Sequence, residues 1–373
     1  MGSADRQRAL DLAMAEPDPA SLGAAERLRK VVAPEAAAWA LTQAGLRRRA
    51  RAKFSRADEM LFTVDGLEQA TRESVRRWRA GRFRSASGVV WDLGCGIGAD
   101  AMALAEAGFE VRAVEADAAT ADAATHNLAL VGAGPAIHGL AEDVALGGSD
   151  AVFLDPARRT ARGRTWNVAD FSPSWDFVLA LLASDRFVCV KLGPGLPKEL
   201  IPDGVQACWV SDGGDVVEVS LWNRLPAGPC AVILPDQVLT RPEERRDLEV
   251  RSVGRYLIEP DGAVIRSGLL AEIAPGRDIW LLDDHIAYLS SDEPVRGPFG
   301  TCFEVLEVHD YDRKALRRLV RERGIGTLEI KKRGIDVDPA ALRRELRPKG
   351  KASATVVLGR TIDGTKALLV RRV

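Results

Sequence analysis

Between residues 88 and 222 the sequence alternates short apolar runs with stretches rich in good helix formers. Runs such as residues 151–154 and 187–191 have the length and β-branched content of buried strands. Helical stretches such as residues 118–130 separate them. This alternation is typical of βαβ units, in which helices cover both faces of a parallel sheet. The sequence therefore predicts an α/β, Rossmann-like core.

A glycine-rich segment follows the first of these strands and opens a helix. It contains Asp92, Gly94, Cys95, Gly96 and Gly98. Glycine lets the backbone approach a ligand closely, and a helix N-terminus offers free N–H groups and a positive dipole end. The third glycine comes one position earlier than in the dinucleotide fingerprint G-x-G-x-x-G. We therefore expect a ligand at the carboxyl edge of the sheet, bound in a different pattern from a dinucleotide.

Acidic side chains follow at the ends of later elements. Glu115 ends the second strand, 17 residues after Gly98, and its carboxylate can accept both hydrogen bonds of a ribose diol. Asp117 is predicted to be a solvent-exposed neighbour or to support Glu115. After the third helix, Glu142 and Asp143 fall where an adenine edge would lie.

Residues 91–98, with Glu115 and Asp143, resemble the class I S-adenosylmethionine-dependent methyltransferases over residues 86–225. The resemblance implies that Asp92 and the loop backbone contact the methionine part, Glu115 the ribose and Asp143 the adenine. The alternative is a doubly wound domain that binds another nucleotide or no ligand. Cys95 is expected to be a small filler rather than a nucleophile. The predicted cofactor-binding residues are Asp92, Gly94, Cys95, Gly96, Gly98, Glu115, Ala116 and Asp143.

The predicted acceptor site is the segment Asp155-Pro156-Ala157-Arg158-Arg159, which follows the fourth strand. In amino-group methyltransferases this position carries an acidic or amide residue, two prolines and an aromatic residue. Asp155 and Pro156 fit that pattern, whereas Ala157 and Arg158 depart from it. We also expect Arg158 and Arg159 either to bind a substrate phosphate or to pair with nearby acids.

A stacking plane for the acceptor base could come from Trp166 or Phe171. The alternative for both aromatic residues is packing in the core or at the rim.

Transfer to a ribose hydroxyl is a second possible reaction. Asp155, Lys191 and Glu218 fall in the order of the Lys-Asp-Lys-Glu tetrad of ribose 2′-O-methyltransferases, and Lys53 is a possible fourth member. A lysine whose pKa is lowered by burial and a cationic neighbour can deprotonate a hydroxyl. In the structural interpretation, Lys191 pairs with Asp155 and Glu218 has a packing role.

The charge is distributed unevenly along the chain. Residues 312–373 hold 18 Lys and Arg against 7 Asp and Glu, a net charge of +11, and the other residues hold 34 against 46, a net charge of −12. A basic terminal module indicates either a polyanionic partner or a well-solvated surface. The module reads as strand, helix, strand, helix and two strands, with the last pair turning at Asp363-Gly364. Another Asp-Gly pair, at 261–262, predicts a hairpin over residues 254–267.

Residues 1–85 are predicted to be helical. Their basic stretches, residues 47–53 and 72–84, are either solvated helix faces or a surface that faces RNA.

Motifs before the glycine loop, the segment at Asp155 and the basic module together resemble bacterial methyltransferases that carry a THUMP-like domain. The helical lead-in and core also distantly resemble the RNA cap guanine-N2 methyltransferases. The resemblance implies an RNA substrate, such as tRNA or rRNA. The alternatives are an inactive RNA-binding protein that retains the fold, or methylation of a small metabolite or a protein. The predicted domains are a helical region (1–85), the methyltransferase domain (86–225), a connecting β-rich segment (226–300) and the THUMP-like domain (301–373).

Several classes of protein are not expected. The sequence contains no stretch of about 18 apolar residues that would span a membrane and no secretory signal pattern. Its five cysteines are scattered without a CxxC pair, which predicts reduced thiols in a cytoplasmic protein and no zinc site. The four histidines show no ligand spacing, so no metal is expected.

Overall fold

The computed structural model describes residues 3–83, 88–147, 150–158, 168–244 and 246–373. The chain forms two compact units. Unit 1 comprises Met1–Gln206 and Val219–Ala227, and unit 2 comprises Ala207–Glu218 and Gly228–Val373.

Unit 1 begins with helices, as the composition predicts. Ser21 caps the second helix by accepting from the N–H of Ala24, and Thr63 caps the fourth in the same way from Gly66. Alanines on the first and third helices pack into one buried cluster, where their small side chains let the helix backbones come close. The helices are α1 (Ser3–Ala15), α2 (Leu22–Arg29), α3 (Pro34–Ala50), α4 (Val64–Gln69) and α5 (Glu73–Arg82).

Key arginines of the two basic stretches point into unit 1. Arg47 is 6% exposed and donates to the carbonyl of Met60 at 2.9 Å. Arg79 is 2% exposed, and its guanidinium lies 4.7 Å from the ring centroid of Phe153. For these residues both predictions, a solvated face and a surface that faces RNA, are wrong, because Arg47 holds α3 to the segment at Met60 and Arg79 packs on the ring of Phe153 in the sheet.

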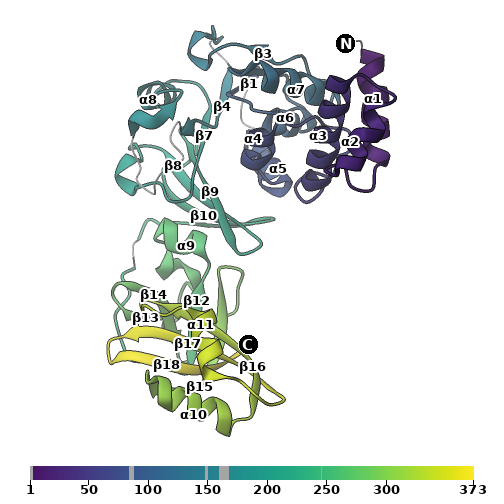
Figure 1. Ribbon diagram of the computed structural model, residues 1–373. Coiled ribbons are helices and arrows are strands. Elements are labelled where there is room, and N and C mark those ends of the chain that lie inside the picture. Colours follow the sequence, from purple (N-terminus) through teal and green to yellow (C-terminus); the bar gives the residue numbers. More distant parts are fainter. Residues whose placement is uncertain (1–2, 84–87, 148–149, 159–167, 245) are drawn as a thin grey trace. The chain divides into compact units, whose positions relative to one another are not determined.

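The sheet of unit 1 has the order β3-β2-β1-β4-β7-β9 (Figure 1). Neighbouring strands are parallel except for the last pair, in which residues 219–222 run antiparallel to β7. β1 and β4 are buried along their whole length because helices cover both faces. This arrangement confirms the predicted Rossmann-like core. The strands are β1 (Val90–Leu93), β2 (Val111–Glu115), β3 (Ile137–His138), β4 (Ala151–Leu154), β7 (Val188–Leu192) and β9 (Asp215–Trp222).

Helices and short elements complete this unit. The helices that follow strands are α6 (Ala99–Glu106), α7 (Ala118–Ala129) and α8 (Trp175–Leu182). Short elements are η2 (Ala141–Asp143), β5 (Ala157–Arg158), η3 (Val168–Asp170), β6 (Phe171–Ser172) and η4 (Lys198–Leu200). Among the described residues, no helix has the length and apolar character that crossing a membrane requires.

Unit 2 contains a seven-stranded sheet of order β13-β14-β12-β15-β18-β17-β16. β15 pairs with β12 on one side and with β18 on the other. The basic module therefore shares its sheet with strands of the preceding segment. The strands are β12 (Tyr256–Pro260), β13 (Trp280–Asp283), β14 (Ile286–Ser291), β15 (Gly300–Asp310), β16 (Ile325–Arg333), β17 (Ala352–Thr361) and β18 (Gly364–Arg372). Further strands are β8 (Gln206–Asp212), β10 (Gly228–Ile233) and β11 (Gln237–Thr240).

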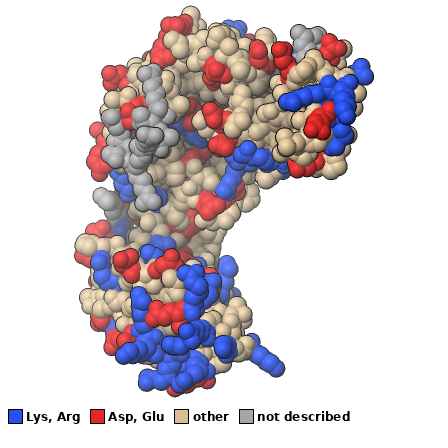
Figure 2. Space-filling model, in the orientation of Figure 1, with Lys and Arg blue, Asp and Glu red and all other residues tan. Residues whose placement is uncertain are grey.

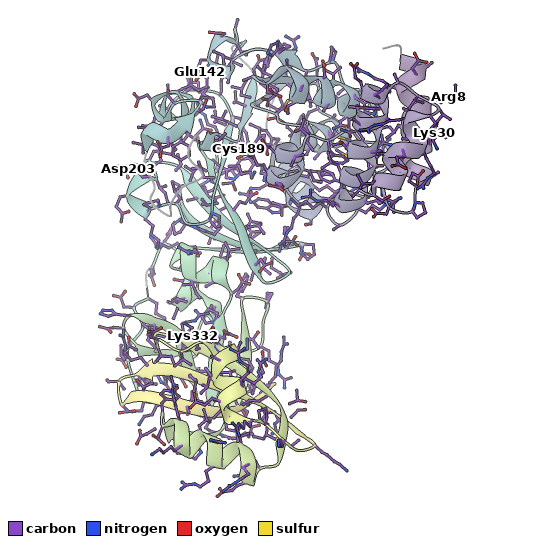
Figure 3. The ribbon with its side chains drawn as sticks, in the orientation of Figure 1. Arg8, Lys30, Glu142, Cys189, Asp203 and Lys332 are labelled. Atoms are coloured by element: carbon purple, nitrogen blue, oxygen red, sulfur yellow. The ribbon has the colours of Figure 1, made fainter. Side chains whose placement is uncertain are left out.

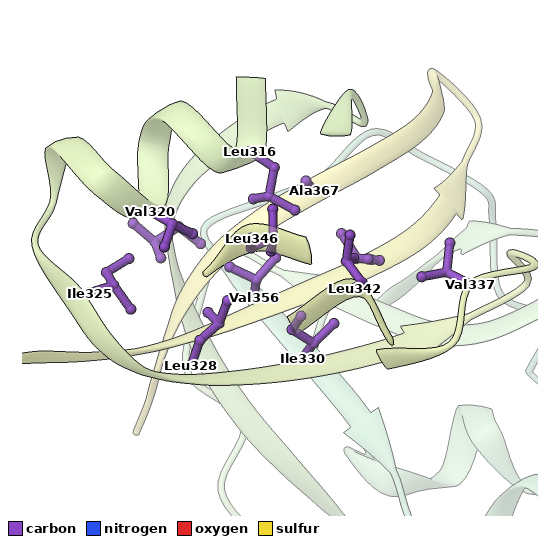
Figure 4. Close-up of a cluster of buried hydrophobic side chains, with 12 residues drawn as sticks. Leu316, Val320, Ile325, Leu328, Ile330, Val337, Leu342, Leu346, Val356 and Ala367 are labelled. Atoms are coloured by element: carbon purple, nitrogen blue, oxygen red, sulfur yellow. The ribbon is translucent and has the colours of Figure 1, made fainter. Parts of the chain in front are cut away.

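Two helices, α10 (Arg313–Glu322) and α11 (Pro339–Leu346), pack on one face of β16, β17 and β18 (Figure 4). Leu316 and Val320 of α10 join Leu342 and Leu346 of α11 in this core. The element order confirms the predicted strand-helix-strand-helix-strand-strand module.

The two Asp-Gly pairs behave differently. Thr361 pairs with Gly364 across the β17–β18 turn, so the hairpin predicted at 363–364 is confirmed. The hairpin predicted over 254–267 is wrong. There, Asp261 caps helix α9 (Gly262–Ser267) by accepting from the N–H of Ala263 at 2.8 Å. A 3₁₀ turn, η5 (Leu270–Ile273), follows it.

Candidate active site

A cavity of about 580 Å³ lies at the carboxyl ends of β1, β2 and β4 in unit 1. Its walls come from the glycine loop, the end of β2, residues 139–142, the segment after β4, and the lead-in around α4. The contribution of α4 was not predicted. The lining residues include Thr63, Asp65, Gly66, Thr71, Asp92, Gly94, Cys95, Gly96, Asp100, Glu115, Ala116, Asp117, Glu142, Phe153, Asp155 and Pro173.

The glycine loop turns beneath this cavity. Gly94, Gly96 and Gly98 have φ angles of +83°, +54° and +78°, a region that other residues rarely adopt. The N–H groups of Gly94 and Cys95 both donate to the carbonyl of Val114 at 2.9 Å, which ties the loop to β2. Burial raises the pKa of the Cys95 thiol well above its usual value, so the thiol is not ionised at neutral pH.

Asn127 of α7 joins the loop to the lead-in. Its side chain is fully buried and donates to the carbonyls of Ile97 (2.8 Å) and Leu61 (2.9 Å). It also accepts from the N–H of Leu61 at 2.8 Å. At Gly66, a Cβ would lie 2.4 Å from Cγ2 of Ile97, so only glycine allows α4 to pack this closely on the loop. The sequence signal for this contact is an asparagine within an alanine-rich helix.

Glu115 is held rigidly at the cavity. One carboxylate oxygen accepts from the N–H of Gly96 at 2.8 Å and the other from the N–H of Asp117 at 2.9 Å. Asp117 caps α7, and its hydrogen bonds from Thr120 lower the pKa of the Asp117 carboxyl. Glu142, labelled in Figure 3, lines the cavity, whereas the predicted adenine contact, Asp143, is not among the lining residues.

Asp92 lies at the floor of the cavity and is fully buried. Neither of its carboxylate oxygens has a hydrogen-bond partner among the described residues. Burial raises the pKa of the Asp92 carboxyl well above its usual range, and the Asp100 and Asp155 carboxylates raise it further. Asp100 itself accepts from the hydroxyl of Thr71 at 3.1 Å and pairs with Arg79. A buried carboxylate without partners calls for a donor or cationic group from a ligand.

The predicted acceptor residues meet at the same edge of the sheet. Asp155 lines the cavity after β4, and one of its oxygens pairs with Nζ of Lys191 on the neighbouring β7. Lys53 instead donates to the carbonyls of Leu67 (2.9 Å) and Glu68 (3.0 Å), near the end of α4. Glu218 is buried in β9.

The chain is 34% identical to an uncharacterized S-adenosylmethionine-dependent methyltransferase of Mycobacterium tuberculosis (strain H37Rv) over 349 residues. The match covers 88% of this chain and 94% of that protein, and the counterpart in strain CDC 1551 matches equally well. The chain belongs to the S-adenosylmethionine-dependent methyltransferases. The cofactor predicted from the glycine loop is therefore confirmed.

Two further comparisons agree with the fold of this methyltransferase. Residues 300–372 match the THUMP domain-like family, which confirms the predicted THUMP-like domain. A solved structure assigned as a methyltransferase, from Porphyromonas gingivalis W83, superposes with a TM-score of 0.80 at 23% identity. That match covers 99% of this chain and 97% of the other.

The residues present fit S-adenosylmethionine. The cavity has the volume of a typical small-molecule site. Asp92 offers an unpartnered buried carboxylate at the glycine loop, and Glu115 offers a carboxylate fixed by two backbone N–H groups. When bound, the cofactor supplies an activated methyl group. Among the described residues, no cluster of His, Cys, Asp and Glu could hold a metal ion.

Some predicted substrate contacts lie outside the described residues. These are Arg159, Trp166 and the side chain of Arg158, whose backbone forms part of β5. Phe171 is 4% exposed and packs against Trp175 with ring centroids 5.4 Å apart, which agrees with the packing interpretation.

Proposed function

We propose that this methyltransferase acts on RNA, with tRNA and rRNA as the candidate substrates, and transfers the methyl group to a base nitrogen held at Asp155 and Pro156. The observation that carries the proposal is a set of exposed cations on the THUMP-like domain. These residues, which we call the basic surface, are exposed and form no ion pair among the described residues. They are Lys314, Arg317 and Arg321 of α10, Arg343 and Arg344 of α11, and Arg347, Lys349 and Lys351 after it.

The charge of the basic surface and the spacing of its cations suit the binding of phosphates. Lys314, Arg317 and Arg321 are spaced so that they share one side of α10. Other cations of this domain are already paired: Arg313 with Glu345, and Lys366 with Asp310. Figure 2 shows Lys and Arg gathered over this part of unit 2. A row of unpaired cations supports binding to a polyanion, and the THUMP-like domain supports RNA as that polyanion.

The ion pair at Asp155 supports an amine acceptor. Lys191 occupies one carboxylate oxygen and leaves the other for a donor group. A carboxylate that pairs with a lysine through one oxygen can accept a hydrogen bond through the other. An exocyclic amine donates N–H groups to such an acceptor, whereas a ribose hydroxyl must first lose its proton. We propose Arg158, Arg159 and Trp166 as further substrate contacts.

The ribose 2′-hydroxyl stays as the second candidate, through Asp155, Lys191 and Glu218, because the charges of Lys53 and Lys191 act on each other. Burial, together with Arg72, lowers the pKa of the Lys53 ammonium, and the charge of Lys191 acts in the same direction. A lowered pKa is what a lysine base requires.

The variants Lys191→Arg and Lys191→Met separate the two chemistries. Arginine can keep the ion pair with Asp155 but cannot act as a base. We therefore expect Lys191→Arg to retain most of the transfer to a base nitrogen, and Lys191→Met to lose much of it. If Lys191 is the base for a ribose hydroxyl, both variants lose the activity.

The experiment that tests the RNA proposal compares modified nucleosides in total RNA from cells with and without the gene by mass spectrometry. We expect one methylated base to disappear in the deletion strain and to return with the intact gene. An unchanged nucleoside profile contradicts the proposal. An inactive RNA-binding protein would also leave the profile unchanged, but it would fail to bind S-adenosylhomocysteine in calorimetry. We also propose a cytoplasmic location, which is supported by five cysteines that form no disulfide among the described residues.

A further inference from the structure

The wall of the cavity beside Asp155 is built from two separate segments of the chain. Asp155 and Ala157 come from the segment after β4, whereas Ser172 and Pro173 come from β6 and the residue after it. The two segments are held together because Ala157 pairs with Ser172 across the antiparallel strands β5 and β6. The pairing places Pro173 at the same end of the cavity as Asp155.

The residues on both sides of Pro173 are fixed by packing and capping. Phe171 is buried and packs on Trp175, the first residue of α8. Ser174 caps α8 by accepting from the N–H of Phe177 at 3.3 Å. Pro173 itself is buried among its neighbours and still lines the cavity. Its ring therefore gives the cavity a rigid apolar wall.

The position of Pro173 bears on how the acceptor segment departs from the pattern of amino-group methyltransferases. In that pattern two prolines follow the acidic or amide residue, whereas Ala157 stands here in the second position. Pro156 is buried and is not among the described residues that line the cavity. The proline that borders the cavity therefore comes from β6 and not from the acceptor segment.

We propose that Pro173 forms the wall against which a planar acceptor ring lies while an exocyclic amine of that ring donates to Asp155. A heteroaromatic ring has apolar faces and a polar edge, so it requires an apolar wall and one well-placed hydrogen-bond acceptor. Ala157 is exposed at the cavity, and its short side chain leaves room for the ring. The acceptor class is therefore a planar ring such as a nucleobase, and not an aliphatic amine. The inference rests on the proposed role of Asp155 and does not require the ring to belong to RNA.

The test measures methyl transfer by the full chain in an extract of the deletion strain. Label is counted separately in the RNA, protein and small-molecule fractions, and the labelled fraction is then the substrate for steady-state kinetics. Pro173→Ala removes two ring methylenes. We expect the KM for the acceptor to rise on the order of tenfold with kcat nearly unchanged, because each methylene that the ring covers contributes about fourfold in affinity. Pro173→Val keeps most of the apolar surface and should stay within about threefold of the wild type.

Donor binding shows whether a variant keeps its fold. Sinefungin carries an amine in place of the sulfonium of the donor and transfers no methyl group, and its dissociation constant in calorimetry should not change. Pro197→Ala is the matched control, because Pro197 is the N-cap of η4 and lies outside the cavity lining. Glu68→Gln is a second control, because Glu68 pairs with Arg49 outside the cavity lining.

A second variant decides if Pro173→Ala loses sinefungin binding. Ala157→Leu places a bulky side chain where the ring would lie, so transfer should fall about tenfold or more while sinefungin still binds. Equal KM values for Pro173→Ala and Pro197→Ala, or normal transfer by Ala157→Leu, overturn the proposal. Label on an aliphatic amine overturns both this proposal and RNA as the acceptor. Label on a small molecule with a planar ring contradicts RNA alone.

Discussion

The cofactor cavity of unit 1 and the basic surface of unit 2 carry opposite charges in a chain whose net charge is only −1. The cavity suits a small cation, and the basic surface suits a polyanion. In the proposed function, the two surfaces divide the work of binding, because phosphates are repelled by the carboxylates around the cavity. A base that reaches Asp155 must therefore enter with its phosphates left outside. Four predictions test the contrast between the two surfaces.

The largest effect is expected at the acceptor end of the cavity. Asp155→Ala removes the carboxylate that pairs with Lys191 and that we propose accepts from the substrate. We expect methyl transfer to fall roughly 100-fold or more, as when one polar group of a reaction site is removed. Donor binding should weaken only a few-fold. Incorporation of tritiated methyl groups into RNA from the deletion strain measures the loss, with Glu68→Gln as the control. Near-normal transfer would remove Asp155 from the reaction.

The next largest effect is expected on the stability of unit 1, which a change at Asn127 should lower without lowering RNA binding. Asn127→Ala leaves the polar groups of Leu61 and Ile97 buried without partners. We expect a loss of about 3 kcal/mol in the free energy of unfolding of unit 1 and weaker donor binding. Thermal denaturation with and without sinefungin measures both. RNA binding by unit 2 should persist below the new melting temperature. If donor binding is unchanged, the hydrogen bonds of Asn127 do not shape the cavity.

Charge reversal on the basic surface should weaken RNA binding and leave donor binding unchanged. We expect Arg317→Glu, Arg321→Glu and Arg343→Glu combined to weaken RNA binding on the order of 30-fold at moderate salt, with a shallower salt dependence. The matched control reverses Arg8, Arg29 and Lys30, which are exposed on unit 1; Arg8 and Lys30 are labelled in Figure 3. Filter binding with total tRNA measures the affinity. Equal losses in both sets would show a general charge effect. Point substitutions are preferable to deleting the domain because β15 pairs with β12 inside a shared sheet.

The smallest expected effect is a difference in pH dependence between ligand binding at the cavity and RNA binding at the basic surface. The pKa of Asp92 is raised, so this carboxyl keeps its proton above the usual range and loses it as pH rises. Ionised Asp92 attracts a cation more strongly, so sinefungin affinity should rise a few-fold with pH through that pKa. Asp100 and Asp155 also face Asp92, and Arg79 acts in the opposite direction. RNA binding by arginines should stay flat over the same pH range. A flat sinefungin profile from pH 5 to 8 would mean that Asp92 does not titrate in that window.

In the absence of ligand, the same shift makes stability depend on pH. Folded Asp92 binds its proton more tightly than the unfolded chain does. The stability that this proton contributes is present below the unfolded pKa and is lost as pH rises through the folded pKa. A cationic ligand should restore it, which thermal denaturation across pH can measure.

Much of the core could be predicted because its signals are local. The apolar run at residues 151–154 became β4 with those limits, and the spacing of Gly94, Gly96 and Gly98 identified the loop. Strand length, helix propensity and the steric freedom of glycine are properties of neighbouring residues, so one sequence reveals them.

The features that were missed depend on contacts between distant residues. Asp261-Gly262 and Asp363-Gly364 are the same dipeptide, yet one caps a helix and the other lies at a hairpin turn. The choice depends on the residues after each pair and on the elements against which they pack. Arg79 sits in a basic stretch that looks solvent-facing, but the Asp100 and Phe153 side chains draw it inward. No local pattern encodes these partners.

The hydrogen bonds of Asn127 to Leu61 and Ile97 also have a consequence for synthesis of the protein. Leu61 and Asn127 are 66 positions apart, and the glycine loop lies between them in the chain. A ribosome makes α4 first, the loop second and α7 last. Until α7 emerges, the nascent chain holds the loop and α4 without the side chain that joins them. The cavity therefore cannot be complete when Asn127 leaves the exit tunnel, because lining residues such as Asp155 and Pro173 are made later still.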